Sequence, residues 1–242
     1  MPVVSAQKFG LAIPTLNEAG NIAVLIERLH ASLESLGIHY ELIVVDDDSR
    51  DGTQEIVAQM AKDDPRLKLL VRKGERGLAG AVLCGWQHTD AELLGVIDAD
   101  LQHPPEVLPK LVRAVEDGYD IAIASRYAQP DSVTGWNFAR RLVSALGTWV
   151  TAPLQRPGLR VKDPLSGYFV LRRKCVDNVH LKPQGFKILL EILVRGNCRS
   201  AVEIPFQFGL RQAGESKANF KVALDYFFQL GRLSRALRLR PR

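Results

Sequence analysis

Asp98 and Asp100 are carboxylates two positions apart, directly after the apolar run Leu93–Ile97. In extended chain, side chains at this spacing point to the same side, so both can face one cation across the small Ala99. Such oxygen ligands suit Mg²⁺ or Mn²⁺, which take further ligands from water and a substrate diphosphate. Gln102 keeps the same parity and can add a carbonyl oxygen. The spacing predicts a metal site; a solvated turn that caps the next helix is the competing interpretation.

Two more polar segments follow apolar runs. Asp46-Asp47-Asp48 comes after Glu41–Val45, and a carboxylate there can accept hydrogen bonds from the ring N–H groups of a nucleobase. The competing role for this loop is helix capping by Asp51 or Thr53. The segment Pro14-Thr15-Leu16-Asn17-Glu18 fits a tight turn into a helix, and by itself it indicates only a turn.

Several cations are candidates for binding phosphate, because a guanidinium group can hold two phosphate oxygens at once. A surface salt bridge is the competing role for any one of them. Arg211 and Lys217 flank Gly214-Glu215-Ser216, a segment that could close over a bound ligand. The candidates are Arg126, Arg140, Arg141, Arg211 and Lys217.

The elements that must position these groups alternate along the first half of the chain. Apolar runs with amphipathic stretches between them predict a mostly parallel sheet with helices on both faces. Ligands of such sheets bind at the carboxyl ends of the strands, where the acidic segments fall. The predicted strands are Phe9–Ile13, Glu41–Val45, Leu67–Val71, Leu93–Ile97 and Ile121–Ala124, and the predicted helices are Asn21–Leu36, Thr53–Ala61, Gly77–His88 and Pro105–Glu116.

The second half is less regular, and we expect it to complete the same α/β domain. We place this domain at residues 1–216, followed by an amphipathic basic helix at 217–242 that is not an independent domain. Predicted elements are a helix at Trp136–Leu154, a strand at Asp163–Arg172, a helix at Phe186–Val194 and a strand at Ala201–Phe206.

The net charge of +5 favours an acidic partner, such as a phosphate ligand, an anionic membrane surface or nucleic acid. A non-catalytic nucleic-acid-binding protein is the interpretation from another class. The acidic segments and the lack of aromatic residues among the basic ones argue against it, so we expect no nucleic acid partner. Three cysteines far apart in the sequence favour the reducing cytosol, and no apolar stretch is long enough to predict a transmembrane helix.

Several segments resemble one known family in order and spacing. The run Asp98-Ala99-Asp100-Leu101-Gln102-His103-Pro104-Pro105-Glu106 is the most specific of them. Together they resemble family 2 glycosyltransferases of the GT-A fold, which is Rossmann-like, and among these the dolichol-phosphate (polyprenol monophosphate) mannose synthases of the short type without transmembrane helices. The other segments are Pro14–Glu18, Val45–Thr53, Ser125–Tyr127, Gly135-Trp136, Arg140, Asp163–Phe169 and Arg211–Lys217.

The resemblance implies a role for each matched residue. Asp98, Asp100 and Gln102 would hold Mg²⁺ or Mn²⁺, and Arg140 and Ser166 would bind the phosphate of a lipid acceptor. Asp100, Arg126, Arg211 and Lys217 would be the catalytic groups. The nucleotide-sugar site would comprise Pro14, Leu16, Glu18, Val45, Asp47, Asp98, Ala99, Asp100, Arg126, Arg211 and Lys217. Many members have Tyr at the position of Leu16 and Gly at that of Asp48, which bears on base stacking and on the backbone of that loop.

The implied reaction is inverting transfer of a hexose, mannose from GDP-mannose, to a polyprenyl or dolichyl monophosphate, with release of the nucleoside diphosphate. A phosphate acceptor is already ionised at neutral pH, so the reaction needs no general base. One alternative is a UDP donor that carries glucose or another sugar. Another is a sugar hydroxyl acceptor, which needs a base, and Glu191 is the candidate.

A lipid acceptor requires the enzyme to reach a bilayer, so we expect a peripheral protein on the cytoplasmic face of a membrane, bound to the surface or to a membrane-embedded partner. Two apolar segments beside arginines could make this contact, Trp136–Val150 and the C-terminal helix. A helix packed on the domain is the competing interpretation. The apolar side of the C-terminal helix comprises Phe220, Leu224, Phe227, Leu230, Leu233 and Leu237.

Overall fold

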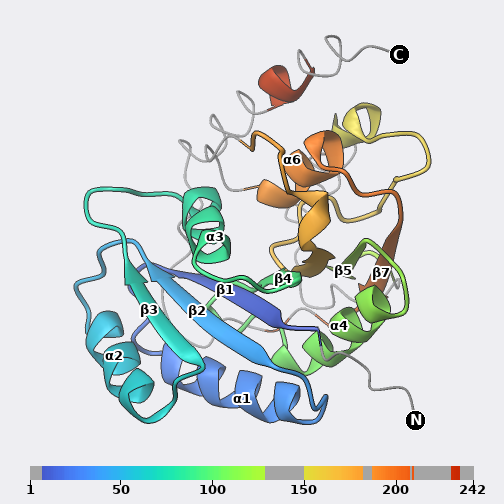
Figure 1. Ribbon diagram of the computed structural model, residues 1–242. Coiled ribbons are helices and arrows are strands. Elements are labelled where there is room, and N and C mark those ends of the chain that lie inside the picture. Colours follow the sequence, from blue (N-terminus) through green and yellow to red (C-terminus); the bar gives the residue numbers. More distant parts are fainter. Residues whose placement is uncertain (1–6, 129–149, 182–186, 208, 210–229, 235–242) are drawn as a thin grey trace.

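A computed structural model describes residues 7–128, 150–181, 187–207, 209 and 230–234. These residues form a seven-stranded sheet of order β3-β2-β1-β4-β6-β5-β7, with helices on both faces (Figure 1). The predicted α/β fold is confirmed. The strands are β1 (Phe9–Thr15), β2 (Tyr40–Asp46), β3 (Leu67–Val71), β4 (Leu93–Val96), β5 (Ile121–Ser125), β6 (Phe169–Arg172) and β7 (Ala201–Pro205).

Alternating side chains of the strands feed two apolar clusters, one on each face of the sheet. In β1, Leu11 and Ile13 enter the first cluster and Ala12 enters the second. The first cluster includes residues of α1 (Ile22–Glu34), α2 (Thr53–Asp63) and α4 (Leu108–Glu116), and the second includes residues of α3 (Leu78–Gln87) and α6 (Ile188–Arg195) (Figure 1). Three short 3₁₀ turns at Pro105–Val107 (η1), Ala152–Leu154 (η2) and Arg173–Cys175 (η3) complete the described elements.

β6 departs from the parallel arrangement, because it runs antiparallel to both β4 and β5. The predicted strand over Asp163–Arg172 is wrong for its first part, since only Phe169–Arg172 pairs in the sheet. Residues 163–168 form a loop whose polar groups bond to neighbouring loops and strands; for example, the Ser166 hydroxyl donates to the Ala124 carbonyl at 2.8 Å. Of the predicted helix Trp136–Leu154, the structure describes only residues 150–154.

The C-terminal helix is described at residues 230–234, where it packs on the domain. Leu230 and Leu233 are buried in a cluster with Leu190 and Val194 of α6. Arg232 lies 3.6 Å from the buried carboxylate of Glu191. For this turn the competing interpretation, a helix packed on the domain, is confirmed. Along the described chain, no helix combines the length and apolarity needed to cross a membrane.

Truncating Leu233 tests this packing. Leu233 is fully buried, so Leu233→Ala should lower the free energy of unfolding by about 2–3 kcal/mol, the lower part of the range for buried leucines. Urea denaturation measures the change. Val24→Ala on α1 is the matched control, because that side chain is 43% exposed and should change stability by less than about 0.5 kcal/mol. Equal small effects of both changes would show that the turn does not pack on α6.

Candidate active site

The loops that follow β1, β2 and β4 share a strained backbone at the carboxyl edge of the sheet. Asn17, Asp48 and Leu101 have φ angles of 55°, 61° and 59°, in the left-handed region. A residue with a side chain adopts this conformation at a cost of about 1–2 kcal/mol, and such strain concentrates at functional sites. At Asp48 the conformation also explains why glycine stands at this position in many members of the resembled family, because glycine adopts it freely.

The turn after β4 holds the two carboxylates that the sequence predicts as metal ligands. Asp100 accepts a hydrogen bond from the backbone N–H of Gln102 at 3.1 Å, which closes the turn. Leu101 between them buries its side chain in the core, and this burial offsets the cost of its positive φ. The turn therefore holds its carboxylates through its own backbone and one buried leucine.

The following residues, His103 to Glu106, anchor this turn to the rest of the domain. His103 is buried between the rings of Tyr168 and Phe206, with ring centroids 5.6 and 5.5 Å away. The Tyr168 hydroxyl donates to the carbonyls of Pro104 and Pro105 at 3.3 and 3.4 Å. Arg28 of α1 grips the Glu106 carboxylate with two hydrogen bonds of 2.9 and 2.8 Å. The segment from the turn at Asp98–Gln102, called the metal turn here after its predicted role, to α4 is thus fixed at several points.

Two cations balance the charge of the carboxylate pair. Burial, with the charge of Asp100 second, raises the pKa of Asp98 to about 7, while Lys187 and Arg126 act in the opposite direction. Burial likewise lowers the pKa of Lys187, and the Arg126 charge adds to that effect. Lys187 donates to the Leu165 carbonyl at 3.2 Å. The site is therefore a group of two acids and two cations in which each charge depends on its neighbours; Asp100 is buried, whereas the Asp98 side chain is 30% exposed.

Arg126 is held in place by Asp163. The buried Asp163 carboxylate accepts from Arg126 Nε at 2.8 Å, from Nη2 at 2.7 Å and from the backbone N–H at 3.0 Å. This bidentate pair fixes the plane of the guanidinium group. Burial opposes the charge on Arg126, but the hydrogen bond to Asp163 prevails and the pKa of Arg126 is raised. Arg126 is therefore a charged group held in a fixed orientation at the carboxyl end of β5, and its role as a phosphate ligand stays a prediction.

The residues at the turn fit a divalent cation. Asp98 Oδ1 is shielded from solvent and has no hydrogen-bond partner among the described residues, as a carboxylate prepared for a ligand would be. A Cβ atom on Gly167 would lie 2.5 Å from Asp98 Oδ2, so the chain approaches this carboxylate as closely as glycine permits. The described part of the chain groups no three His, Cys, Asp or Glu side chains as a ligand set, so a cation here would also need Gln102, water or substrate oxygens.

The three aspartates of the acidic segment at the end of β2 make different contacts. Asp46 accepts from Thr15, Ser49 and Gln54 and so organises the loop. Asp47 pairs with Arg72, whose Nη2 is 2.7 Å away, and its other oxygen accepts from the Gly77 N–H at 2.8 Å. The Asp48 carboxylate lies 3.7 Å from Arg50 at the surface. Asp47 is therefore the aspartate held in a fixed orientation by a buried cation.

The N-cap residue of α2 is Gly52, which makes no side-chain cap bond, so the predicted capping by Asp51 or Thr53 is wrong; both residues instead tie the loop together. Asp51 Oδ1 accepts from the Thr53 N–H at 3.1 Å, while its Oδ2 accepts from the Ala19 N–H at 3.0 Å. Glu18 is tied to the same loop, since its N–H donates to the Thr53 hydroxyl at 2.9 Å. The turns after β1 and β2 thus form one bonded unit.

Other predicted nucleotide-binding residues lie on or beside this unit. Pro14 and Leu16 are half-buried at the end of β1. The side chain of Val45 is fully buried against Ile43 and Ala81, so a nucleoside could meet only its backbone. Ala99 is buried between the two metal-turn aspartates. These roles stay predictions.

Four of the candidate phosphate ligands lie outside the described residues, namely Arg140, Arg141, Arg211 and Lys217. Gly209, two positions before Arg211, is described, and its N–H donates to the Gln102 carbonyl at 2.9 Å. Ser166, the other predicted lipid-phosphate ligand, is buried and its hydroxyl donates to the Ala124 carbonyl, so here it serves the loop. Glu191, the alternative base, is buried 3.2 Å from Arg195 and paired with Arg232, an arrangement that does not favour proton abstraction.

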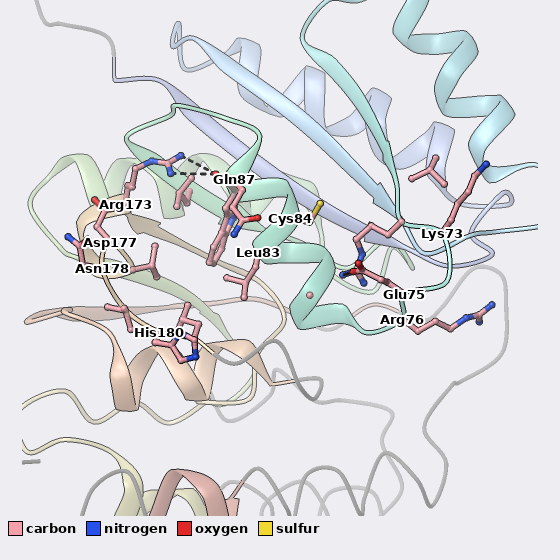
Figure 2. Close-up of a pocket in the computed structure, with 18 residues that line it drawn as sticks. Lys73, Glu75, Arg76, Leu83, Cys84, Gln87, Arg173, Asp177, Asn178 and His180 are labelled. Atoms are coloured by element: carbon pink, nitrogen blue, oxygen red, sulfur yellow. Dashed lines mark hydrogen bonds and ion pairs between the residues drawn. The ribbon is translucent and has the colours of Figure 1, made fainter. Parts of the chain in front are cut away.

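A separate groove of about 1000 Å³ lies beside α3 (Figure 2). Its wall opposite α3 is formed by Arg173 and residues 176–181, and Arg173 is fixed by bonds to the Trp86 carbonyl. The groove includes Arg72, which bonds Asp47, but neither metal-turn aspartate lines it. This groove is therefore distinct from the carboxylate site.

Three residues of the site escaped the sequence analysis: Lys187, Arg72 and Gly167. Lys187 stands at the N-cap of α6, where a cation meets the unfavourable end of the helix dipole. A lysine at the start of a predicted helix is the one feature of the sequence that indicated a site residue here. Arg72 and Gly167 act through contacts between distant segments, and no spacing rule predicts these.

The raised pKa of Asp98 predicts a pH-dependent cation site. Only the ionised carboxylate binds metal, so binding strengthens as pH rises through about 7. Calorimetric titration with Mn²⁺ should give an affinity about tenfold weaker at pH 6 than at pH 8, because one proton must leave. Asp98→Asn should bind weakly and lose this pH dependence. An affinity for wild type that is the same at both pH values would contradict the assignment of Asp98.

Gly167→Ala tests the close approach at Asp98. The added Cβ would displace the carboxylate, so the affinity for Mn²⁺ should fall at least tenfold while the protein stays folded. Gly231→Ala is the matched control, because nothing lies within 4 Å of the Cβ position there. Unchanged binding by the Gly167 variant would show that the carboxylate does not need its observed position.

The sequence of this chain is similar to those of known proteins. Residues 11–179 match the family model described as glycosyl transferase family 2. The dolichol-phosphate mannosyltransferase of Pyrococcus furiosus is 44% identical over 93% of this chain, and the match spans 63% of that protein's length. The dolichol-phosphate mannosyltransferase of Saccharomyces cerevisiae is 37% identical over 93% of this chain and 86% of its own.

Solved structures give the same fold. Mannosyl-3-phosphoglycerate synthase from Rubrobacter xylanophilus superposes with a TM-score of 0.68 at 19% identity, over 97% of this chain and 76% of its own. Glucosyl-3-phosphoglycerate synthase from Mycobacterium tuberculosis, solved with Mn²⁺, UDP and phosphoglyceric acid, has a TM-score of 0.66 at 19% identity, over 98% of this chain and 81% of its own. The family model spans most of the chain, and the chain therefore belongs to glycosyl transferase family 2.

Proposed function

We propose that this protein transfers mannose from GDP-mannose to a polyprenyl or dolichyl monophosphate, with inversion at the anomeric carbon and release of GDP. The observation that carries the proposal is the group of Asp98, Asp100, Arg126 and Lys187 at the carboxyl edge of the sheet. Two acids that can hold a cation, beside two fixed cations, suit a reaction in which phosphate groups both leave and attack. Relatives that bear the name dolichol-phosphate mannosyltransferase support the choice of donor and acceptor.

Asp98, Asp100 and Gln102 would hold the divalent cation, Mg²⁺ or Mn²⁺. When bound, it neutralises the charge that builds up on the departing diphosphate. Arg126 would donate to a phosphate oxygen while Asp163 fixes its plane. Lys187 would supply a second positive charge on the same side. These groups are preorganised, so they stabilise charge without reorganising during the reaction.

The acceptor fits a site without a general base. A phosphate monoester is ionised at neutral pH, so its oxygen attacks the anomeric carbon and no proton need be removed. The buried His103 beside the metal turn suits no base role, because burial lowers its pKa to about 4 and encloses its ring. Glu191 is held by arginines, so a sugar hydroxyl acceptor with Glu191 as base is the weaker alternative.

At the donor end, Asp47 would accept hydrogen bonds from the ring of the nucleobase, with Arg72 holding its carboxylate. A carboxylate can pair with guanine or uracil, so a UDP sugar is the second candidate donor. Arg211 and Lys217 follow Gly209 in the sequence, and the Gly209 N–H donates to the Gln102 carbonyl in the turn after β4. We assign both to donor or acceptor phosphates, and Arg140 to the lipid phosphate.

The acceptor's hydrocarbon chain implies contact with a bilayer or with a membrane-embedded partner, on the cytoplasmic face. The basic residues after Arg232 would favour an anionic lipid surface. Leu230 and Leu233 are excluded from that contact, because they pack on α6.

Radiolabelled sugar transfer tests the proposal. Purified protein with polyprenyl phosphate in detergent should transfer mannose from GDP-mannose, and excess EDTA should stop it. Asp100→Asn should reduce kcat at least a hundredfold with little change in folding, since the amide removes a charged metal ligand. Glu191→Gln should retain transfer to the phosphate acceptor. Transfer only from UDP sugars would reject the mannose donor, and full activity in EDTA would reject the metal.

A further inference from the structure

One loop, residues 162–168, contacts three of the four charged groups of the site. Asp163 orients Arg126 through three hydrogen bonds. The Leu165 carbonyl accepts from Lys187 Nζ at 3.2 Å. Gly167 lies against the Asp98 carboxylate. A displacement of this loop would therefore move both cations and one carboxylate together.

The loop is tied to β7 by the carboxylate of Glu203. Oε1 accepts from the Asp163 N–H at 2.9 Å and Oε2 from the Lys162 N–H at 2.8 Å. Charge-assisted bonds of an ionised carboxylate to two successive amides are strong and fix direction as well as distance. The pairing of β7 with β5 places Glu203 opposite Ile123. Ile123 lies three residues before Arg126 in the chain. Strand β7 thus sets the position of the loop relative to Arg126.

We infer that Glu203 is a positioning residue for sugar transfer, which acts by holding the loop that orients Arg126 and Lys187. The Glu203 carboxylate accepts both hydrogen bonds from main-chain N–H groups of the loop, so its effect is to fix the backbone of the loop. Two hydrogen bonds connect β7 to Arg126. The Asp163 N–H donates to Glu203 on β7, and the Asp163 carboxylate accepts from Arg126. The kinetic part of this inference rests on the proposed function.

Glu203→Gln tests it. Glutamine offers one acceptor oxygen, and its NH₂ group would oppose the second amide, so one of the two bonds is lost. We expect kcat to fall about tenfold to a hundredfold, because small misplacements of positioning groups cost that much, with a smaller change in the KM for the donor. Glu203→Asp keeps the charge on a shorter side chain and should recover part of the activity.

Glu41→Gln is the matched control. This half-buried carboxylate on β2 accepts from Lys68 at 2.7 Å and Thr89 at 2.6 Å, near the opposite edge of the sheet. Both glutamine variants should lower Tm comparably, and only the Glu203 variant should lose kcat. Equal losses of kcat in the two variants, or wild-type kcat in Glu203→Gln, would overturn the inference.

A measurement that needs no substrate separates this inference from the proposed function. Hydrogen exchange of the Arg126 Nε–H, followed by ¹⁵N NMR, reports whether Asp163 still holds the guanidinium. The exchange should speed up at least fivefold in Glu203→Gln and stay unchanged in Glu41→Gln. If wild type transfers no sugar from any donor, the proposed function fails while this result still decides the role of Glu203. Unchanged exchange in Glu203→Gln would reject that role.

Discussion

The site depends on one electrostatic constraint, which is that two carboxylates lie close together at the end of β4, Asp100 buried and Asp98 partly exposed. Burial raises the pKa of Asp98, and the like charge of Asp100 raises it further. The arrangement persists because Arg126 and Lys187 lie within electrostatic reach. Two effects disfavour the charged form of Lys187, namely burial and the positive end of the α6 dipole. A bound divalent cation would relieve the repulsion between the acids.

The antiparallel strand β6 explains how the second half of the chain reaches this group. The parallel strands β4 and β5 end at the carboxyl edge, whereas β6 begins there, since Phe169 pairs with Val96 and with Ile123. The loop that leads into β6 must therefore lie among the loops that leave β4 and β5. An inserted antiparallel strand thus lets residues 162–168 meet Asp98 and Arg126 without a long connection.

The sequence predicted those parts of the site that local spacing determines. Asp98 and Asp100 follow a continuous apolar strand, and this pattern placed them correctly at the carboxyl edge. The predicted strand Asp163–Arg172 forms only at Phe169–Arg172, because the polar groups of Asp163 and Ser166 bond to other segments. Arg72 and Lys187 were not predicted, because the groups that they contact, Asp47 and Leu165, lie 25 and 22 residues away in the chain and pairing at that distance leaves no periodic pattern.

Helix α6 links the C-terminal turn to the metal edge, which changes how the basic tail is understood. Lys187 begins the helix near Asp98, and Leu190 and Val194 further along bury Leu230 and Leu233. Leu165 joins the same apolar cluster with its side chain and holds Lys187 with its carbonyl. Because Arg232 pairs with the buried Glu191, it belongs to the folded domain and is not a free surface charge. The turn at 230–234 therefore supports the helix whose N-cap residue, Lys187, is a cation of the site.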